Sequence, residues 1–244
     1  MAKPLIQVAL DSLDFNQTLA LAKQTAPFVD IIEIGTPCVK ANGIELVKAM
    51  KAQHPDKLLL VDLKTMDAGH YESEPFFKAG ADITTVLGTA DLGTIKGVID
   101  AANKYGKQAQ VDLINVSDKA KCAKAVAGAG AHIIGVHTGL DQQAAGQTPF
   151  ADLSALAALG LKVKISVAGG IKQSTIQQVV KSGADIVVAG GAIYGAASPA
   201  DAARELRELA NSAGGESGCC GGHAAAAPAA GGGLLDKLKK MLGL

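Results

Sequence analysis

The sequence predicts an α/β protein folded as a TIM (β/α)8 barrel, followed by a flexible C-terminal linker and a short amphipathic helix. Short apolar, β-branched runs alternate with segments of helical periodicity, which favours βαβ units and a parallel sheet. Eight such units fit within roughly 210 residues, the size of a small barrel. Nearly half of the residues are hydrophobic but only 3% are aromatic. Such a composition is typical of buried parallel sheets packed by Val, Ile, Leu and Ala.

The expected strands and helices follow one another in regular order. The eight apolar runs cover residues 5–10, 29–34, 58–63, 83–87, 109–114, 132–136, 163–167 and 186–189. Helical periodicity is clearest in residues 15–25, 43–53, 92–103, 119–127 and 174–181. A doubly wound open sheet is the alternative, but DSLDFN follows the first strand where a dinucleotide-binding fold would have GxGxxG. The barrel is therefore the favoured architecture.

A short motif recurs just before three of the expected strands. It reads AGADI at 79–83, AGAHI at 129–133 and SGADI at 182–186. The glycine follows a helical stretch, where it ends a helix at low energetic cost. The recurrence of this motif predicts a repeated helix-to-strand turn. Ordinary glycine capping, without an ancestral repeat, explains the recurrence equally well.

Bulk composition excludes several classes of protein. Lys and Arg together number 23, as do Asp and Glu, so no basic excess points to a nucleic-acid partner. No apolar run reaches the ~18 residues that a membrane-spanning helix needs, and the N-terminus lacks the features of a signal peptide. The cysteines, Cys38, Cys122, Cys219 and Cys220, do not form a disulfide framework. We therefore expect a cytoplasmic, reducing compartment.

The composition changes after residue 212, which we take as the end of the catalytic barrel (1–212). Residues 213–233 are rich in Gly and Ala and predict a flexible linker. Its Cys219, Cys220 and His223 do not match zinc-site spacing. Residues 234–244, LLDKLKKMLGL, place apolar side chains at helical spacing with lysines elsewhere on the wheel. We expect this helix to dock on a protein shell, a scaffold or a membrane surface; an engineered addition or a solubilising extension is the alternative.

Polar residues fall where the expected strands end, and a TIM barrel carries its chemistry at that edge. They are Asp11, Glu33, Asp62, Lys64, Asp112, Asn115 and His137. Because side chains alternate along a strand, Asp62 and Lys64 face the barrel mouth if Val61 faces the helices. A lysine among carboxylates keeps its charge and stabilises an anion that develops on a substrate. A purely structural ion-pair network is the alternative.

Two further groups of residues suggest a metal and a base. Glu33 and Asp62 come from neighbouring strands, and their oxygens suit Mg²⁺, with Mn²⁺ as the other choice. The alternative is that one carboxylate pairs with Lys64 and no metal binds. His137 is a candidate general acid or base, because the histidine side chain in general titrates near neutral pH and this residue ends an expected strand.

Two glycine pairs follow the last two expected strands. They are Gly169–Gly170 in VAGGI and Gly190–Gly191 in VAGGAI. Glycine lets backbone N–H groups approach an anion closely, and TIM barrels commonly hold phosphate in these two loops. The pairs therefore predict a phosphate site, although tight turns alone would also account for them.

These motifs together resemble the orotidine-5′-phosphate decarboxylase suprafamily over residues 1 to about 212. The D-x-K-x-x-D motif ending in Asp67 carries the resemblance. Within the suprafamily, VDLKTMDAG with Glu33 and His137 is similar to the branch of 3-keto-L-gulonate-6-phosphate decarboxylase and 3-hexulose-6-phosphate synthase. The resemblance implies Mg²⁺ near Glu33 and Asp62, and a 1,2-cis-enediolate stabilised by the metal and Lys64. It also implies a homodimer in which Asp67 reaches the neighbouring subunit's site.

Three departures separate the two activities of this branch. The decarboxylase is expected to have AGRSI where this chain has AGGAI, with Gly191 in place of Arg, and HRSRD where it has HTGLD (137–141). It is also expected to have Glu in place of Asp112. The resemblance therefore implies reversible addition of formaldehyde to D-ribulose 5-phosphate, giving D-arabino-hex-3-ulose 6-phosphate, as in formaldehyde fixation by the ribulose monophosphate pathway. His137 is the first candidate base and Asp112 the second; the decarboxylase is the alternative.

Overall fold

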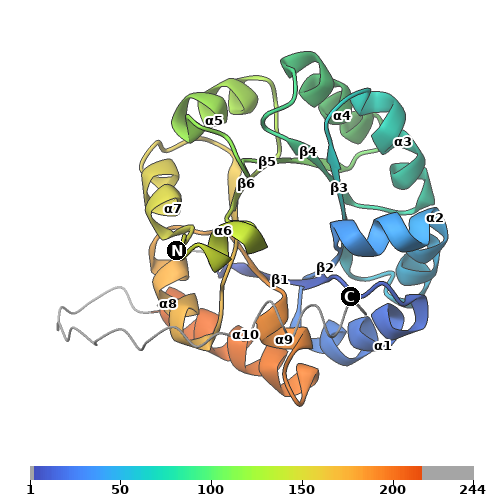
Figure 1. Ribbon diagram of the computed structural model, residues 1–244, viewed down its shortest axis with the longest axis vertical. Coiled ribbons are helices and arrows are strands. Elements are labelled where there is room, and N and C mark those ends of the chain that lie inside the picture. Colours follow the sequence, from blue (N-terminus) through green and yellow to red (C-terminus); the bar gives the residue numbers. More distant parts are fainter. Residues whose placement is uncertain (1–2, 216–244) are drawn as a thin grey trace.

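A computed structural model of the chain describes residues 3–215, which form a closed barrel of eight parallel strands paired in chain order, with helices around it (Figure 1). The predicted TIM barrel is confirmed. The strands are β1 Leu5–Leu10, β2 Ile31–Ile34, β3 Leu58–Thr65, β4 Ile83–Leu87, β5 Gln108–Asp112, β6 Ile133–His137, β7 Lys164–Ala168 and β8 Ile186–Ala189. The helices are α1 Phe15–Thr25, α2 Thr36–Gln53, α3 Gly69–Ala79, α4 Leu92–Lys104, α5 Lys119–Gly128, α6 Leu140–Ala144, α7 Phe150–Ala157, α8 Gln173–Lys181, α9 Gly191–Tyr194 and α10 Pro199–Gly215, with a 3-10 turn η1 at Ala26–Phe28.

Each of the eight predicted strands overlaps an observed strand, and the differences lie at their ends and in the helices. Helix α2 begins at Thr36, whereas the helical periodicity predicts a start at residue 43. Gly43 interrupts the helix with a non-helical φ of 61°, so the periodicity does not continue across this residue. The segments with the clearest periodicity do not include α3, α6, α7, α9 or α10. Helix α10 continues through Gly215, past the predicted barrel boundary at 212. The rest of the predicted linker, and the whole predicted helix 234–244, lie outside the described residues.

A repeated hydrogen bond ties the strands together in pairs at the N-terminal end of the barrel. The residue just before each even-numbered strand accepts a hydrogen bond from the second backbone N–H of the preceding odd-numbered strand. The pairs are Asp30 with Ile6, Asp82 with Leu59, His132 with Ala109, and Asp185 with Ile165. The recurring AGADI-like motif therefore supplies a side-chain partner for a strand N–H, in addition to a helix-ending glycine.

The apolar core has two parts. One lies between the sheet and the outer helices and contains Val61, while Leu63 packs against it. The other fills the lower barrel interior with Ile31, Leu60, Ile83, Ile133, Ile186 and Val188. Two residues further along β2, β3 and β4, the inward positions become polar, with Glu33, Asp62 and Thr85. Gln110 on β5 and Ser166 on β7 are buried polar residues that line the same cavity. The apolar plug thus closes the barrel from below and leaves a polar floor for any cavity above it.

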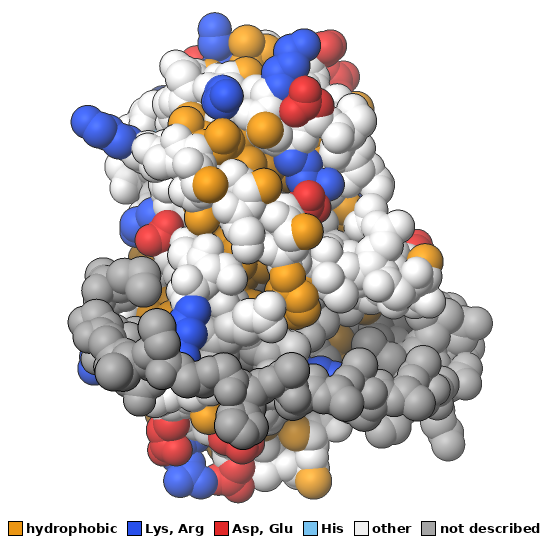
Figure 2. Space-filling model, turned by 90° about the vertical axis from the view of Figure 1, so that its left-hand side faces the viewer, with side chains coloured by type: hydrophobic (Ala, Val, Ile, Leu, Met, Phe, Trp, Pro, Cys, Tyr) orange, Lys and Arg blue, Asp and Glu red, His pale blue; other side chains and the backbone are white. Residues whose placement is uncertain are grey.

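The outer surface shows no separation of charge on the face drawn in Figure 2. Over the described part of that face, basic and acidic side chains are interspersed around a band of apolar ones. Within residues 3–215, no helix is both long enough and apolar enough to span a membrane.

Candidate active site

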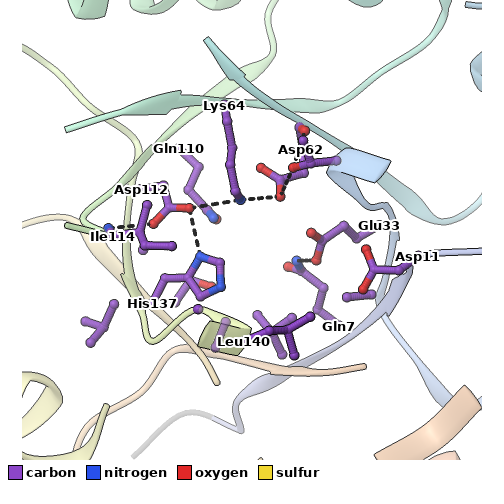
Figure 3. A pocket seen from close by; sticks show the side chains of 18 of the residues that line it. Gln7, Asp11, Glu33, Asp62, Lys64, Gln110, Asp112, Ile114, His137 and Leu140 are labelled. Atoms are coloured by element: carbon purple, nitrogen blue, oxygen red, sulfur yellow. Dashed lines mark hydrogen bonds and ion pairs between the residues drawn. The ribbon is translucent and has the colours of Figure 1, made fainter. Parts of the chain in front are cut away.

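A cavity of about 320 Å³ opens among the C-terminal ends of the strands (Figure 3). Six residues predicted from the sequence line it: Asp11, Glu33, Asp62, Lys64, Asp112 and His137. They come from β2, β3, β5 and β6 or directly follow β1, and their side chains converge because alternation turns every second residue inward. The barrel therefore gathers most of the predicted polar residues at one place.

Four of these side chains form a continuous polar chain across the cavity. The Lys64 Nζ atom lies 2.5 Å from Asp62 Oδ2 and 3.2 Å from Asp112 Oδ2. The same Asp112 oxygen lies 2.9 Å from His137 Nδ1. Burial opposes the charge on Lys64, but the Asp62 and Asp112 carboxylates outweigh it and raise the pKa of Lys64 above its ordinary value. Lys64 therefore carries a permanent positive charge at the centre of the site.

The Asp112 carboxylate stays ionised although it is almost fully buried. Burial raises its pKa, but the hydrogen bond and charge of His137, the charge of Lys64 and the backbone N–H of Ile114 bring the pKa down to about 2. With Asp112 bound to Nδ1, the Nε2 atom is the ring nitrogen of His137 that remains for a substrate. The pair fixes the orientation of the imidazole, as an acid beside a catalytic histidine does.

The backbone of β3 departs from regular strand geometry at Lys64. Its φ is 47°, and the β3–β4 register shifts between Val61 and Thr65. This irregularity leaves the Lys64 N–H without a regular ladder partner, and it donates instead to the Thr85 hydroxyl at 2.9 Å. A non-glycine residue with positive φ is uncommon, and such residues cluster at functional sites.

Two hydroxyl groups hold the Asp62 carboxylate in place. Thr85 donates to Oδ1 at 2.6 Å, and Thr36 donates to Oδ2 at 2.7 Å. Sequence reasoning does not find either threonine, because each contact joins residues more than 20 positions apart and depends on strand register. Of the two, only Thr85 lies on an expected strand, where the adjacent Thr84 makes the sequence signal ambiguous.

Glu33 and Asp11 form an acidic corner on the other side of Asp62. Burial and then the nearby Asp62 carboxylate raise the pKa of Glu33 to about 8, and the same two causes raise the pKa of Asp11. The Gln7 amide donates to Glu33 Oε2 at 2.6 Å and partly offsets this effect. Three carboxylates thus share this side of the cavity, with one lysine to neutralise them.

The donor set fits a hard divalent cation. Carboxylate oxygens are the ligands that Mg²⁺ prefers, and it usually takes one or two of them while keeping several waters. Mutual repulsion between Glu33 and Asp62 is also the condition that a bound cation relieves. Within residues 3–215, no three His, Cys, Asp or Glu side chains are grouped to hold a metal ion. Glu33 and Asp62 would therefore need water or substrate oxygens to complete the shell.

A second cavity of about 550 Å³ adjoins the first, and all four predicted phosphate-site glycines line it. Gly169 has a φ of 118°, and a Cβ there would lie 2.5 Å from the Thr138 carbonyl oxygen, so no other residue fits. Gln143, Lys172 and Tyr194 also line this cavity. Sequence reasoning missed Lys172, although a lysine two residues after a Gly-Gly pair is a visible signal for an anion.

The structure does not bring Asp67 or Asn115 to the cavity, and Asn115 accepts a hydrogen bond from the Gln142 amide instead. Asp67 is the more important of the two, because it ends the D-x-K-x-x-D motif. Its side chain is exposed, and its Oδ1 accepts a hydrogen bond from the Ala68 N–H at 2.7 Å. The predicted contact between Asp67 and a neighbouring subunit stays a prediction.

The fold and site geometry agree with a comparison against known families. Residues 4–206 match the orotidine 5′-phosphate decarboxylase / HUMPS family. The chain belongs to this family.

Individual relatives are similar over nearly their whole length. A 3-hexulose-6-phosphate synthase from Methylomonas aminofaciens is 69% identical over 206 residues, which cover 84% of this chain and 99% of that protein. A crystal structure of a 3-hexulose-6-phosphate synthase is 51% identical, with a TM-score of 0.78, and covers 84% of this chain and 99% of its own. A ligand-bound crystal structure of KGPDC from Streptococcus mutans is 28% identical, with a TM-score of 0.82, over 88% of this chain and 100% of its own. The fold thus matches the synthase structure and the KGPDC structure about equally well, whereas the sequence identity is higher to the synthases.

Proposed function

We propose that this chain is an aldehyde-lyase that adds formaldehyde reversibly to D-ribulose 5-phosphate and forms D-arabino-hex-3-ulose 6-phosphate. The observation that carries this proposal is the 69% identity to a protein named 3-hexulose-6-phosphate synthase, 99% of which is covered. The cavity supports it, because a permanent cation and an oriented histidine lie beside a glycine-lined space fit for a phosphate.

The sugar phosphate would bind with its phosphate against the backbone of the two glycine turns, Gly169–Gly170 and Gly190–Gly191. Lys172 supplies a positive charge at the rim of that cavity. This placement puts the carbonyl end of the sugar toward β3, β5 and β6, where Lys64 and His137 lie. The two adjoining cavities thus match the two ends of one substrate.

His137 is the better of the two candidate bases for the C1 proton. Asp112 has a pKa of about 2 and is already bonded to Lys64 and His137, so it is a weak base. His137 has Nε2 available, and Asp112 holds its ring in position through Nδ1. The electron pair left by the proton becomes an enediolate, whose charge Lys64 stabilises.

A divalent cation held by Glu33 and Asp62 would supply Lewis-acid polarisation of the substrate oxygens when bound. Thr36 and Thr85 fix one of these ligands, and Gln7 fixes the other. The three side chains keep the carboxylates aimed at the cavity.

The alternative is decarboxylation of 3-keto-L-gulonate 6-phosphate, which passes through the same kind of intermediate. The similarity to the Streptococcus mutans structure is the observation that favours this alternative. Formaldehyde consumption with ribulose 5-phosphate, measured beside CO₂ release from the keto acid, separates the two. Formaldehyde-dependent turnover is expected, and CO₂ release without it would contradict the proposal.

We also propose a homodimer with shared sites. Met66 and Tyr71 flank Asp67 and expose 54% and 84% of their surface, which is typical of an apolar contact region. Mixing inactive Asp67→Ala and Lys64→Met proteins should restore about a quarter of the activity, because half of the random dimers then contain one intact shared site. No restoration after subunit exchange would contradict shared sites.

For residues 234–244 we propose docking to a shell protein, a scaffold or a membrane surface, on their amphipathic pattern alone. Because α10 ends at Gly215, truncation after that residue spares the described helix. The truncated enzyme should keep its turnover and lose co-sedimentation with its partner. Unchanged co-sedimentation would end this proposal.

A further inference from the structure

A polar recess lies in the floor of the 320 Å³ cavity, below the Asp112–His137 pair. Gln110 lies two residues before Asp112 on β5, and its amide points into the cavity in Figure 3. Gly135 pairs with Asp112 on one side and with Ser166 on the other. A Cβ on residue 135 would come within 3.1 Å of Gln110 Nε2, so the missing side chain leaves room for this amide. The recess is therefore lined by the Gln110 amide and the Ser166 hydroxyl, with free space beside Gly135.

The Gln110 amide is buried but incompletely bonded. Only 8% of the residue is exposed, and its Oε1 atom has no hydrogen-bond partner among the described residues. Leaving such an atom unpaired costs about 1–3 kcal/mol, so buried polar groups are usually satisfied by protein, water or ligand. Gln7 has a similar unpaired Oε1, but its Nε2 is committed to Glu33. Gln110 is therefore the better candidate for a ligand-binding amide.

From this placement we infer that Gln110 binds the oxygen of the one-carbon electrophile, an inference that rests on the proposed function. Lys64, Asp112 and His137 mark the wall where the enediolate forms, and Gln110 lies directly below this wall. Gly135 and Ser166 line the same cavity, and the absence of a side chain at Gly135 leaves space beside the Gln110 amide for a small aldehyde.

The bond changes are balanced without any further reactant. The C1=C2 π pair of the enediolate forms the bond from C1 to the formaldehyde carbon, the C2 oxygen re-forms the carbonyl, and the C=O π pair of formaldehyde moves onto the formaldehyde oxygen. The Gln110 Nε2–H donates a hydrogen bond to this oxygen as its charge grows. The oxygen then takes the proton that the base removed from C1.

The test separates the two halves of the reaction. Exchange of the C1 proton of ribulose 5-phosphate with D₂O requires no formaldehyde, whereas product formation does. In Gln110→Met, which keeps the length of the side chain, the KM for formaldehyde should rise about tenfold, the effect of one hydrogen bond. The KM for ribulose 5-phosphate and the exchange rate should stay within about twofold of the wild type.

Gln108→Met is the matched control. It makes the same change on the same strand, at a residue that lines a separate cavity together with His132 and Lys164. This variant should leave both KM values unchanged. If Gln110→Met does not fold, Ser166→Ala removes one hydroxyl from the recess and should also raise only the KM for formaldehyde.

Two other outcomes have distinct meanings. If the wild type shows no formaldehyde-dependent turnover, the proposed function fails. If the wild type turns over normally but the recess variant loses proton exchange, or keeps its KM for formaldehyde, then Gln110 does not bind the electrophile.

Discussion

Replacing Lys64 with Met removes the cation around which the site is arranged. The Asp62 and Asp112 side chains, 10% and 4% exposed, then lose a charged hydrogen bond each. Asp62 keeps two threonine donors and Asp112 keeps His137. The expected net loss of unfolding free energy is therefore about 2 kcal/mol. For a domain of this size that lowers the Tm by roughly 4–8 °C, so Lys64→Met stays folded at 25 °C.

Catalysis should suffer more than stability in this variant. Losing a preorganised group that stabilises a developing anion typically costs ~3–4 kcal/mol, or about 10²–10³ in rate. Exchange of the ribulose 5-phosphate C1 proton with D₂O, followed by NMR, should fall by that factor because Lys64 acts before formaldehyde does.

Lys51→Met provides the matched control for the Lys64 variant. The Lys51 side chain is 25% exposed, against 23% for Lys64, and its Nζ lies 2.8 Å from Asp82 near the opposite end of the barrel. It should lose stability without losing exchange. Exchange in Lys64→Met within threefold of the wild type would refute the assigned role, because that role requires a loss of about 10² or more.

Three further changes have outcomes that follow from the same geometry. Because burial and Asp62 raise the pKa of Glu33 to about 8, Mg²⁺ must displace a proton from Glu33 when it binds. Calorimetry should therefore show the affinity of the enzyme for Mg²⁺ falling about tenfold per pH unit from pH 8 to 6. A flat profile of affinity against pH would exclude Glu33 as a ligand. Lys172→Ala should raise the KM for ribulose 5-phosphate about five- to tenfold with kcat unchanged, since Lys172 is an exposed partner of the phosphate; an unchanged KM would remove it from the site. The pKa of Asp82 is lowered because, although burial opposes it, hydrogen bonds from Lys107, Lys51 and the Leu59 N–H prevail. Its stabilisation is therefore present above the unfolded pKa near 4 and lost as pH falls below it. Urea unfolding should show Asp82→Asn about 1–2 kcal/mol less stable at pH 7, with a smaller difference at pH 3.5; equal differences would contradict the ion pairs.

Strand periodicity accounts for what the sequence reveals of the site. Because side chains alternate, one strand-end motif suffices to predict that Asp62 and Lys64 share a face, and the barrel rule places that face at the mouth. The structure agrees, since Val61 and Leu63 pack on the helix side. The barrel also brings the loops after β7 and β8 together, so the two glycine pairs can be predicted to line one phosphate site.

The contacts that sequence reasoning misses depend on register and backbone irregularity. The Lys64 N–H reaches the Thr85 hydroxyl at the place where the β3–β4 register shifts, between Val61 and Thr65, and no local pattern encodes that shift. Gln110 reaches the cavity floor because Gly135, on the next strand, lacks a side chain. The predicted role of Asp67 depends on a second subunit and not on contacts between strands of one barrel. Propensity and period describe one strand at a time, whereas these features arise between strands.

The most direct test of the central proposal follows the carbon of formaldehyde. The enzyme is supplied with ¹³C-formaldehyde and unlabelled ribulose 5-phosphate, and the product is examined by ¹³C NMR. We expect label at C1 of a 3-hexulose 6-phosphate, formed in proportion to the ribulose 5-phosphate consumed. Absence of labelled sugar phosphate, with C1 proton exchange still proceeding, would show that the enediolate forms but that formaldehyde is not its electrophile.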